Sequence, residues 1–292
     1  QRAREFAEVV KGLWDSWEPD AFIRDKSTGI FFDAKKMHAL RHVGPHFKVR
    51  GPLNVGPSPQ GRPVMVQAGS SEDGRALAAE TADVIFTAHS SIESAQAFYS
   101  DIKQRAVKFG READDVKIMP GFFVTVGSST DEARDKFEAL QNLIHPKAGL
   151  LLLSNYMGMD MTKYDIDGPV PDLPNNKTLT SRAQLLLNLA RRDNLSIKQL
   201  YMKVAGARGH QQLYGTPAEI ADALEMWFTQ GAADGFNIMP PVLPESLQEF
   251  VELVIPELQR RGLFRTAYEG TMLRENLDLK RPINRYVEPL NK

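Results

Sequence analysis

The chain has 292 residues, of which 42% are hydrophobic and 25% charged, and this composition is typical of a globular protein with a sizeable core. Its formal net charge of −1 gives no sign of a nucleic-acid or membrane surface, and no apolar run reaches the roughly 18 residues of a membrane-spanning helix. The sequence contains no cysteine, which excludes disulfides, thiolate metal sites and cysteine nucleophiles. A cytoplasmic location is compatible with this, and we expect it.

The first sixty residues predict one helix and little regular structure after it. Apolar residues at helical spacing predict a helix over about 1–17 with no capping residue before it, so we expect that an N-terminal segment is missing. The stretch 18–60 is rich in glycine, proline and charge. Within it, residues 46–53 predict a short hairpin outside the main sheet.

The most informative stretch is Pro63-Val-Met-Val-Gln-Ala-Gly-Ser-Ser-Glu-Asp-Gly74. It predicts a buried strand over 63–68 and a helix over 72–81. Gly69 allows a sharp backbone turn, and Ser70 or Ser71 can cap the helix. Because a helix start presents free N–H groups and a positive dipole end, this turn is a candidate phosphate site. The alternative is an ordinary strand–helix loop with a serine cap.

Two further strand–helix units follow this one. The strands are predicted over 83–88 and 116–126 and the helices over 91–110 and 130–144, with Ala95, Phe98, Ile102 and Ala106 on one face of the first helix. The alternation then breaks over about 146–208, which indicates an insertion. It contains an apolar run at 150–153, a proline- and glycine-rich loop near 168–174 and a helix over about 178–192.

The alternation resumes after the insertion. Thr216-Pro-Ala-Glu219 forms a capping box with proline at the first helical position, and it predicts a helix over 217–230. A fourth strand is predicted over 234–239, followed by a helix over 246–261 that ends at Gly262. We expect the polar tail from 265 to wrap a neighbouring molecule or to be loosely held.

Four predicted parallel strands that alternate with helices favour a barrel or a doubly wound sheet. No G-x-G-x-x-G motif follows any strand, so a Rossmann or P-loop fold is disfavoured. A complete (β/α)8 barrel needs eight strands over about 250 residues. The count of four therefore favours the C-terminal part of a barrel.

Several segments in combination resemble a known family. These are Phe6-Ala-Glu-Val-Val-Lys-Gly-Leu-Trp-Asp-Ser-Trp17, His46-Phe-Lys-Val-Arg-Gly-Pro-Leu-Asn54, Gln67-Ala-Gly-Ser-Ser71, Tyr214-Gly-Thr-Pro217, Gly231-Ala-Ala-Asp-Gly-Phe-Asn-Ile-Met-Pro-Pro241 and Val254-Ile-Pro-Glu-Leu-Gln-Arg-Arg-Gly-Leu-Phe264. They resemble the bacterial-luciferase-like flavin monooxygenases, in the branch of nitrilotriacetate monooxygenase component A and dibenzothiophene-sulfone monooxygenase. The resemblance covers about residues 1–265 as one barrel domain, with 266–292 as a tail. Family members are longer at the N-terminus, where the first barrel strands lie.

The resemblance implies an α/β TIM-like (β/α)8 barrel that uses reduced FMN from a separate NAD(P)H:flavin reductase. The flavin would react with O2 to give a C4a-(hydro)peroxide that transfers one oxygen atom to a small organic substrate. The resemblance also assigns the flavin phosphate to Ala68, Gly69, Ser70 and Ser71. This assignment agrees with the phosphate site expected from the strand–turn–helix pattern.

Two histidines are candidates for the chemistry, and each has an ordinary alternative. His210 lies in a glycine-rich loop that could reach the top of the barrel and hydrogen-bond the flavin or the substrate, and we predict that it is catalytic. His89 follows a barrel strand at its catalytic end, so we assign it to the substrate pocket. The alternative in both cases is a loop histidine without a role. His38, His42 and His46 are four residues apart, but Gly44 and Pro45 break any helix between them, and we expect no metal site.

Asn155 and Tyr156, within the insertion, are predicted to line the substrate pocket, because insertions in this family cover the mouth of the barrel. The alternative is a packed loop. A different function also stays open: an incomplete, non-catalytic barrel that needs a partner chain, because an unclosed barrel exposes sheet edges. We expect a homo-oligomer. A third, weaker possibility is a deazaflavin (F420) oxidoreductase.

Overall fold

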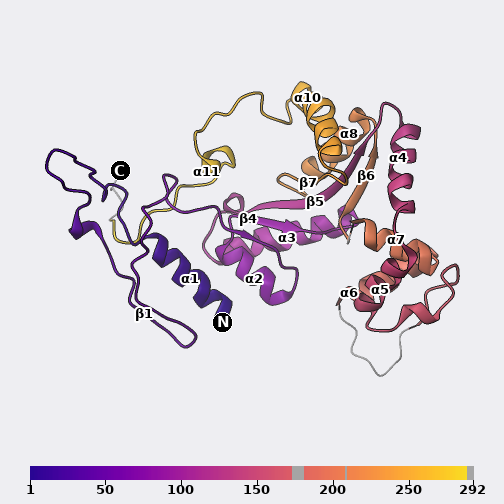
Figure 1. The fold of residues 1–292 in the computed structure, drawn as a ribbon, viewed down its shortest axis with the longest axis horizontal. Coiled ribbons are helices and arrows are strands. Elements are labelled where there is room, and N and C mark those ends of the chain that lie inside the picture. Colours follow the sequence, from indigo (N-terminus) through magenta and orange to yellow (C-terminus); the bar gives the residue numbers. More distant parts are fainter. Residues whose placement is uncertain (173–180, 208, 288–292) are drawn as a thin grey trace. The chain divides into compact units, whose positions relative to one another are not determined.

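A computed structural model describes residues 1–172, 181–207 and 209–287 (Figure 1). The chain divides into two compact units. The first unit comprises Gln1–Thr87, Ala97–Met119 and Arg265–Lys292, and the second comprises Ala88–Gln96 and Pro120–Phe264. Within the described ranges, no helix has both the length and the apolar character needed to cross a membrane.

The first unit is built on short parallel strands covered by two helices. Its regular elements are α1 (Arg2–Trp14), η1 (Ala34–Lys36), β1 (His42–Val43), β2 (Lys48–Val49), β3 (Val66–Gln67), α2 (Glu72–Thr81), β4 (Val84–Thr87), the larger part of α3 (Ile92–Lys108), η2 (Ala113–Asp115), the start of β5 (Lys117–Val126) and α11 (Leu273–Asn276). Strands β3 and β4 pair in parallel, with Val66 opposite Val84. The start of β5 continues beside β4, because the Lys117 N–H donates to the Asp83 carbonyl at 2.8 Å.

The core of this unit lies between α2, α3 and the strands. It consists of Ala78, Ala82, Ile85, Phe98, Ile102, Ala106, Val116 and Ile118, all at most 3% exposed. Three of the four residues predicted to share one face of the helix over 91–110 are in this cluster, and the fourth, Ala95, is buried in the core of the second unit. The helical spacing therefore identified the buried face of α3 correctly.

The hairpin lies earlier in the chain than the sequence predicts. Strands β1 and β2 pair antiparallel with His42 opposite Val49, and the turn between them is closed by the Gly44 N–H, which donates to the Phe47 carbonyl at 2.9 Å. The prediction of a hairpin over 46–53 is wrong in register. Pro52 has no N–H to give to a ladder, so the second strand ends before it.

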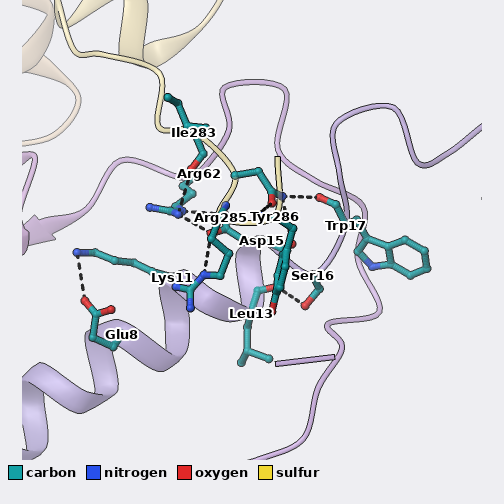
Figure 2. A network of polar contacts seen from close by, with 11 residues as sticks. Glu8, Lys11, Leu13, Asp15, Ser16, Trp17, Arg62, Ile283, Arg285 and Tyr286 are labelled. Carbon is teal, nitrogen blue, oxygen red and sulfur yellow. Dashed lines mark hydrogen bonds and ion pairs between the residues drawn. The ribbon is translucent and has the colours of Figure 1, made fainter. Parts of the chain in front are cut away.

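The described tail residues 265–287 pack against their own chain, so the prediction of a loosely held tail is wrong for them, while wrapping of a neighbour stays a prediction. Arg274 is 5% exposed and donates to the Asp83 carboxylate at 2.6 Å. Figure 2 shows a second attachment at the end of α1. The buried Asp15 carboxylate there accepts from Arg62 and Arg285. Two distant parts of the sequence are thus joined through buried charged groups.

The second unit has a parallel sheet in which β5 is central. The rest of β5 pairs with β6 (Gln211–Gly215) on one side and β7 (Asn237–Met239) on the other. The sequence predicted β7 but missed β6. The residues just before β6 include glycines, Gln211 and Gln212 are polar, and Gly215 follows at once, so the segment lacks the apolar signal of a strand.

Helices cover one face of this sheet. They are α8 (Pro217–Thr229), α9 (Glu245–Glu249), the π-helical turn η4 (Phe250–Val254) and α10 (Ile255–Arg260). The predicted capping box is confirmed: Thr216 Oγ1 accepts from the Glu219 N–H, and Glu219 accepts from the Thr216 N–H. The single helix predicted over 246–261 contains the π turn because Pro256 lacks an N–H and its ring would clash with the carbonyl four residues earlier.

The predicted insertion forms a separate helical cluster. After α4 (Thr130–Asn142) come α5 (Pro146–Met157), η3 (Met161–Lys163), α6 (Ser181–Arg192) and α7 (Ile197–Ala207), and Figure 1 shows α5, α6 and α7 gathered together. Their shared core includes Leu153, Met161, Ile197, Leu200 and Tyr201. The sequence predicted α6 but not α5 or α7. The start predicted for α6, residues 178–180, lies outside the described residues, as does the end of the loop predicted near 168–174.

Candidate active site

The predicted phosphate loop is a capped helix start in the first unit. Ser71 is the N-cap of α2, and its Oγ accepts from the Gly74 N–H at 3.2 Å. Helix geometry leaves the N–H groups of Glu72 and Asp73 without an acceptor inside the helix. Ser70 precedes the cap and is exposed. The residues predicted at 68–71 therefore form the kind of turn at which backbone N–H groups can bind an anion.

Gly69 serves this turn through close contact rather than through a left-handed backbone. Its φ lies outside the positive range, which differs from the sharp turn expected from the sequence. A Cβ at Gly69 would lie 3.0 Å from the amide nitrogen of Gln67 and 3.5 Å from the Cα of Gly74. A Cβ at Gly74 would in turn lie 3.0 Å from Ser71 Oγ. The two glycines let the loop fold tightly over the first turn of α2.

The side-chain amide of Gln67 stabilises this turn through its nitrogen, while its oxygen has no hydrogen-bond donor among the described residues. Its Nε2 donates to the Gly74 carbonyl at 3.3 Å. Its Oε1 is buried, and no donor in the described part of the chain reaches it. A buried carbonyl-type oxygen without a donor is costly, so a ligand hydroxyl or N–H in this position would stabilise the site.

A chain of charged groups runs from this loop to α3. Arg75 donates to the Ser70 carbonyl at 2.9 Å and to Asp101 at 3.2 Å. Arg105 joins Asp101, at 2.7 Å, to Glu72, at 2.6 Å. Burial disfavours ionisation of Asp101, but the hydrogen bonds from Arg105 and Arg75 outweigh it, so the pKa of Asp101 lies below its ordinary value.

These contacts decide which charges an anion would meet. The Glu72 carboxylate in the first turn of α2 opposes anion binding, and Arg105 neutralises it. Arg75 uses two of its five N–H donors in the contacts above, and its guanidinium also lies over the Phe98 ring. The sequence analysis did not assign Arg75. Its position four residues after the predicted cap, on the first turn of the helix, was the signal that could have identified it.

The second unit contains a cavity of about 190 Å³ beside β5 and β6. It is lined by Phe123, Thr125, Phe137, Leu140, Gln141, Ile144, Gly206, Gln212 and Pro241. Phe122 and Val124 are in the core beneath α8, and since side chains alternate along a strand, Phe123 and Thr125 point away from that core. The lining is mostly apolar with two amide groups, which suits an organic ligand with a few polar atoms. None of these residues was predicted, because they come from four separate elements.

Gly206 fits the cavity wall closely. A Cβ at this position would lie 2.7 Å from the Gln141 amide oxygen and 2.8 Å from the Gln212 amide nitrogen. Only glycine lets both amides approach the backbone of α7 at this point. The position of the two polar groups in the cavity is therefore coupled to this residue.

The structure places the two predicted histidines in different surroundings. His210 directly precedes β6, its N–H donates to the Ala207 carbonyl at 2.9 Å, and its ring centre is 6.3 Å from that of Phe123, a residue of the cavity wall. His210 thus lies at the start of β6, beside one residue of the cavity wall but not among the residues that line the cavity, whereas the sequence placed it in a glycine-rich loop. His89 follows β4, and its Nδ1 is 2.9 Å from Ser94 Oγ.

Asn155 and Tyr156 lie on α5 and are not among the residues that line the cavity. Asn155 is exposed, and Tyr156 packs against the core of the helical cluster. Their part in substrate binding stays a prediction. Elsewhere, His38 contacts Glu18 and His42 contacts Glu5, and the described residues contain no group of three His, Asp or Glu side chains that could hold a metal ion.

A parallel α/β sheet with an anion-binding helix start after one strand is typical of enzymes that bind a phosphate-bearing ligand. Residues 1–234 match the model of the luciferase-like monooxygenase family. Over 291 residues the chain is 54% identical to N-acetyl-S-(2-succino)cysteine monooxygenase of Bacillus subtilis (strain 168), covering 99% of this chain and 66% of that protein. Over 290 residues it is 52% identical to nitrilotriacetate monooxygenase component A of Aminobacter aminovorans, covering 99% and 64%.

The solved structure of riboflavin lyase with modified FMN and riboflavin is 33% identical and superposes with a TM-score of 0.78, covering 94% of this chain and 60% of that one. The chain belongs to the luciferase-like monooxygenase family. The predicted family, its branch and the TIM-like barrel fold class are thereby confirmed. The chain spans about two thirds of the length of these relatives or less.

Proposed function

We propose that this chain is part of a flavin-dependent monooxygenase that takes reduced FMN and transfers one oxygen atom from O2 to a small organic substrate. The observation that carries the proposal is the Ser71-capped start of α2, with free N–H groups, a paired glycine fold and the unfilled Gln67 oxygen. It occurs in a chain whose relatives are named monooxygenases.

The residues of the loop fit the phosphate end of FMN. The N–H groups of Glu72 and Asp73 and the hydroxyl of Ser70 would donate to the phosphate, with Arg75 as its counter-charge. Gln67 Oε1 would accept from a ribityl hydroxyl, which would give the buried oxygen its missing donor. When bound, reduced FMN supplies the activation of O2, and the protein's task is to position it and to exclude water.

The cavity of the second unit is the proposed place for the substrate. Its apolar walls would hold a carbon skeleton and exclude water, while Gln141 and Gln212 would orient polar atoms. His210 would donate or accept a proton at the edge of this cavity. The relatives carry the names of different substrates, and we propose for this chain a small organic substrate with a few polar atoms.

The proposed reaction needs a source of reduced flavin. A separate NAD(P)H:flavin reductase would supply it, and the name "component A" of one relative supports a system of more than one component. The dependence on NAD(P)H favours the cytoplasm as the location. We also propose a homo-oligomer, and the molecular mass in solution tests this directly.

The first experiment is a fluorescence titration of FMN, oxidised and reduced under nitrogen, against the chain and its variants. Ser70→Ala and Arg75→Met should each raise the Kd about tenfold or more, because hydrogen bonds to a charged group contribute about 1.5–3 kcal/mol. Ser71→Ala should do the same. Ser129→Ala is its matched control, because Ser129 caps α4 in the same way but is assigned no ligand.

Each alternative predicts its own result. Tight binding of F420 with no binding of FMN would favour a deazaflavin oxidoreductase. Absence of all flavin binding in a well-folded chain would favour the non-catalytic barrel that needs a partner. FMN binding that is equally strong in all the loop variants would show that α2 is not the phosphate site.

A further inference from the structure

The first unit contains a second polar cavity, of about 200 Å³, which the proposed reaction does not use. It lies where the strands begin: Met65 directly precedes β3, Asp83 directly precedes β4, and Asp115 ends η2 just before β5. The cavity and the phosphate loop lie at opposite ends of α2, a helix of ten residues and hence about 15 Å long. The lining is Lys11, Arg62, Met65, Glu80, Thr81, Asp83, Arg111, Asp115, Arg274, Leu279, Lys280 and Pro282.

Cations outnumber carboxylates in this lining. Five lysines and arginines line the cavity beside three acidic residues, and the carboxylates of Asp15, Glu112 and Glu8 pair with three of these cations from outside the lining. Three of the cations have good carboxylate partners. Arg274 is held by Asp83, Lys280 contacts Glu112 and Asp115, and Arg62 is held by Asp15, as Figure 2 shows.

The other two cations are poorly matched. Arg111 is half-buried and donates to the carbonyls of Ala79 at 2.9 Å and Asp115 at 2.7 Å, but within the described ranges no carboxylate lies at ion-pair distance from it. Burial lowers the pKa of Arg111, and the charges of Asp83 and Asp115 offset only part of this effect. Among the residues that the structure describes, the one ion-pair partner of Lys11 is Glu8 on its own helix, at 3.8 Å (Figure 2). The positive charges of Arg111 and Lys11 are thus only partly neutralised by nearby carboxylates.

We propose that this cavity binds a phosphate group, either as inorganic phosphate or as the phosphomonoester of a small metabolite. A phosphate anion would compensate Arg111 and Lys11, the two lining cations that lack a close carboxylate partner, and guanidinium and ammonium donors are the groups that bind phosphate best. The cavity is large enough for one phosphate with its nearest waters, and its cationic lining favours an anion over a neutral apolar ligand. The rival explanation is that Arg111 only caps the carbonyl end of α2.

The test is isothermal titration of inorganic phosphate, at constant ionic strength, into the chain that carries Ser70→Ala and Ser71→Ala. These changes weaken the flavin-phosphate loop as a competing site. One binding event should remain in this background. Arg111→Gln should weaken it about tenfold or more, and Lys11→Met should weaken it less. Lys163→Met, on an exposed residue of η3, is the control and should leave it unchanged.

The outcomes separate the two explanations. If Arg111 is only a cap, Arg111→Gln lowers thermal stability but leaves phosphate binding as it was, and the proposal fails. If Arg111→Gln does not fold, Lys11→Met decides in the same way. If the chain with Ser70→Ala and Ser71→Ala and no other change does not bind phosphate, the proposal also fails. Glycerol 3-phosphate that binds more tightly than phosphate would identify a phosphomonoester, equal binding would identify the free ion, and succinate that binds as tightly would overturn the assignment to phosphate.

Discussion

Substitution by alanine should affect stability differently at two glycines of the helical cluster, Gly149 and Gly206. A Cβ at Gly149 would lie 2.3 Å from the ring of Tyr201, which is 2% exposed and cannot move. At Gly206, the Cβ would meet only the ends of two glutamine side chains. Gly149→Ala should therefore cost about 1–3 kcal/mol through overpacking. Gly206→Ala should be nearly neutral, because alanine gains about 1 kcal/mol of helix propensity.

Urea denaturation of the two variants measures this difference, and each serves as control for the other. Equal losses of stability would contradict the close packing of α5 on α7. Gly206→Ala should also displace Gln141 and Gln212 in the cavity. A crystal structure of that variant would show whether the two amides have moved.

The lowered pKa of Glu132 should make the folding stability of the chain depend on pH. Hydrogen bonds from the hydroxyl and N–H of Ser128, together with Lys136, lower the pKa of Glu132 from 4.5 to about 2. A carboxyl with a lowered pKa contributes stability above its unfolded pKa, and this contribution is lost as the pH falls. The parent chain should therefore lose more stability between pH 4.5 and about 2 than Glu132→Gln does.

Thermal unfolding as a function of pH checks this prediction as a difference between variants, because other carboxylates titrate in the same range. Glu138→Gln is the control. It lies on the same helix, is exposed, and has no hydrogen bond to the residues that the structure describes. If both variants follow the parent curve, the Ser128–Glu132 contact does not stabilise α4.

At the scale of single residues, the sequence could locate the helix cap but not its neighbours in space. A serine before a helix is a local signal that left Ser70 and Ser71 as candidates, and the structure has Ser71 as the cap. The pairing of Arg75 with Asp101 joins residues 26 positions apart, and no local pattern encodes it. The same holds for the cavity lined by Phe123 and Gln212.

Among the elements, those with a strong period were predicted and those without one were missed. Helices α2 and α8 have caps and a clear apolar face, and their bounds agree with the sequence to within one residue. Helix α5 is apolar almost all round, and β6 begins with two glutamines. Neither shows a period that distinguishes strand from helix. Packing against the neighbours decides their structure.

The capping box of α8 gives a prediction at this scale. Thr216 Oγ1 accepts from the Glu219 N–H, and Glu219 also accepts from Thr130 on α4. Thr216→Ala should cost about 1 kcal/mol, since the cap satisfies an N–H that the helix cannot. Thr216→Ser keeps the hydroxyl and is the matched control. Chemical denaturation should rank the serine variant near the parent, and a similar loss in both would mean that the methyl group, not the cap, matters.

For the whole molecule, the resemblance of several segments established more than the periodicity did. Periodicity counted four strands and left a barrel and a doubly wound sheet both open. The combination of specific blocks identified the family and with it the fold. What neither approach could give is the path of the tail after residue 265, because its attachments are single arginine and asparagine side chains with partners about 190 or more positions away.

The buried ion pair between Arg274 and Asp83 should hold the tail to the rest of the chain. Arg274 and Asp83 form an ion pair whose side chains are only 6% and 15% exposed, and Arg274 also donates to the carbonyls of Arg62 and Pro63. Among the described residues, Arg274→Met would leave the Asp83 carboxylate with the Met65 N–H as its hydrogen-bond donor and with the more distant charge of Arg111, so we expect a loss of about 3–5 kcal/mol. Arg281→Met, at an exposed position of the same tail, should cost less than about 0.5 kcal/mol. Urea denaturation gives the two energies, and limited proteolysis should cut the tail of Arg274→Met first. Equal stability of the two variants would show that the tail is held by something other than this buried pair.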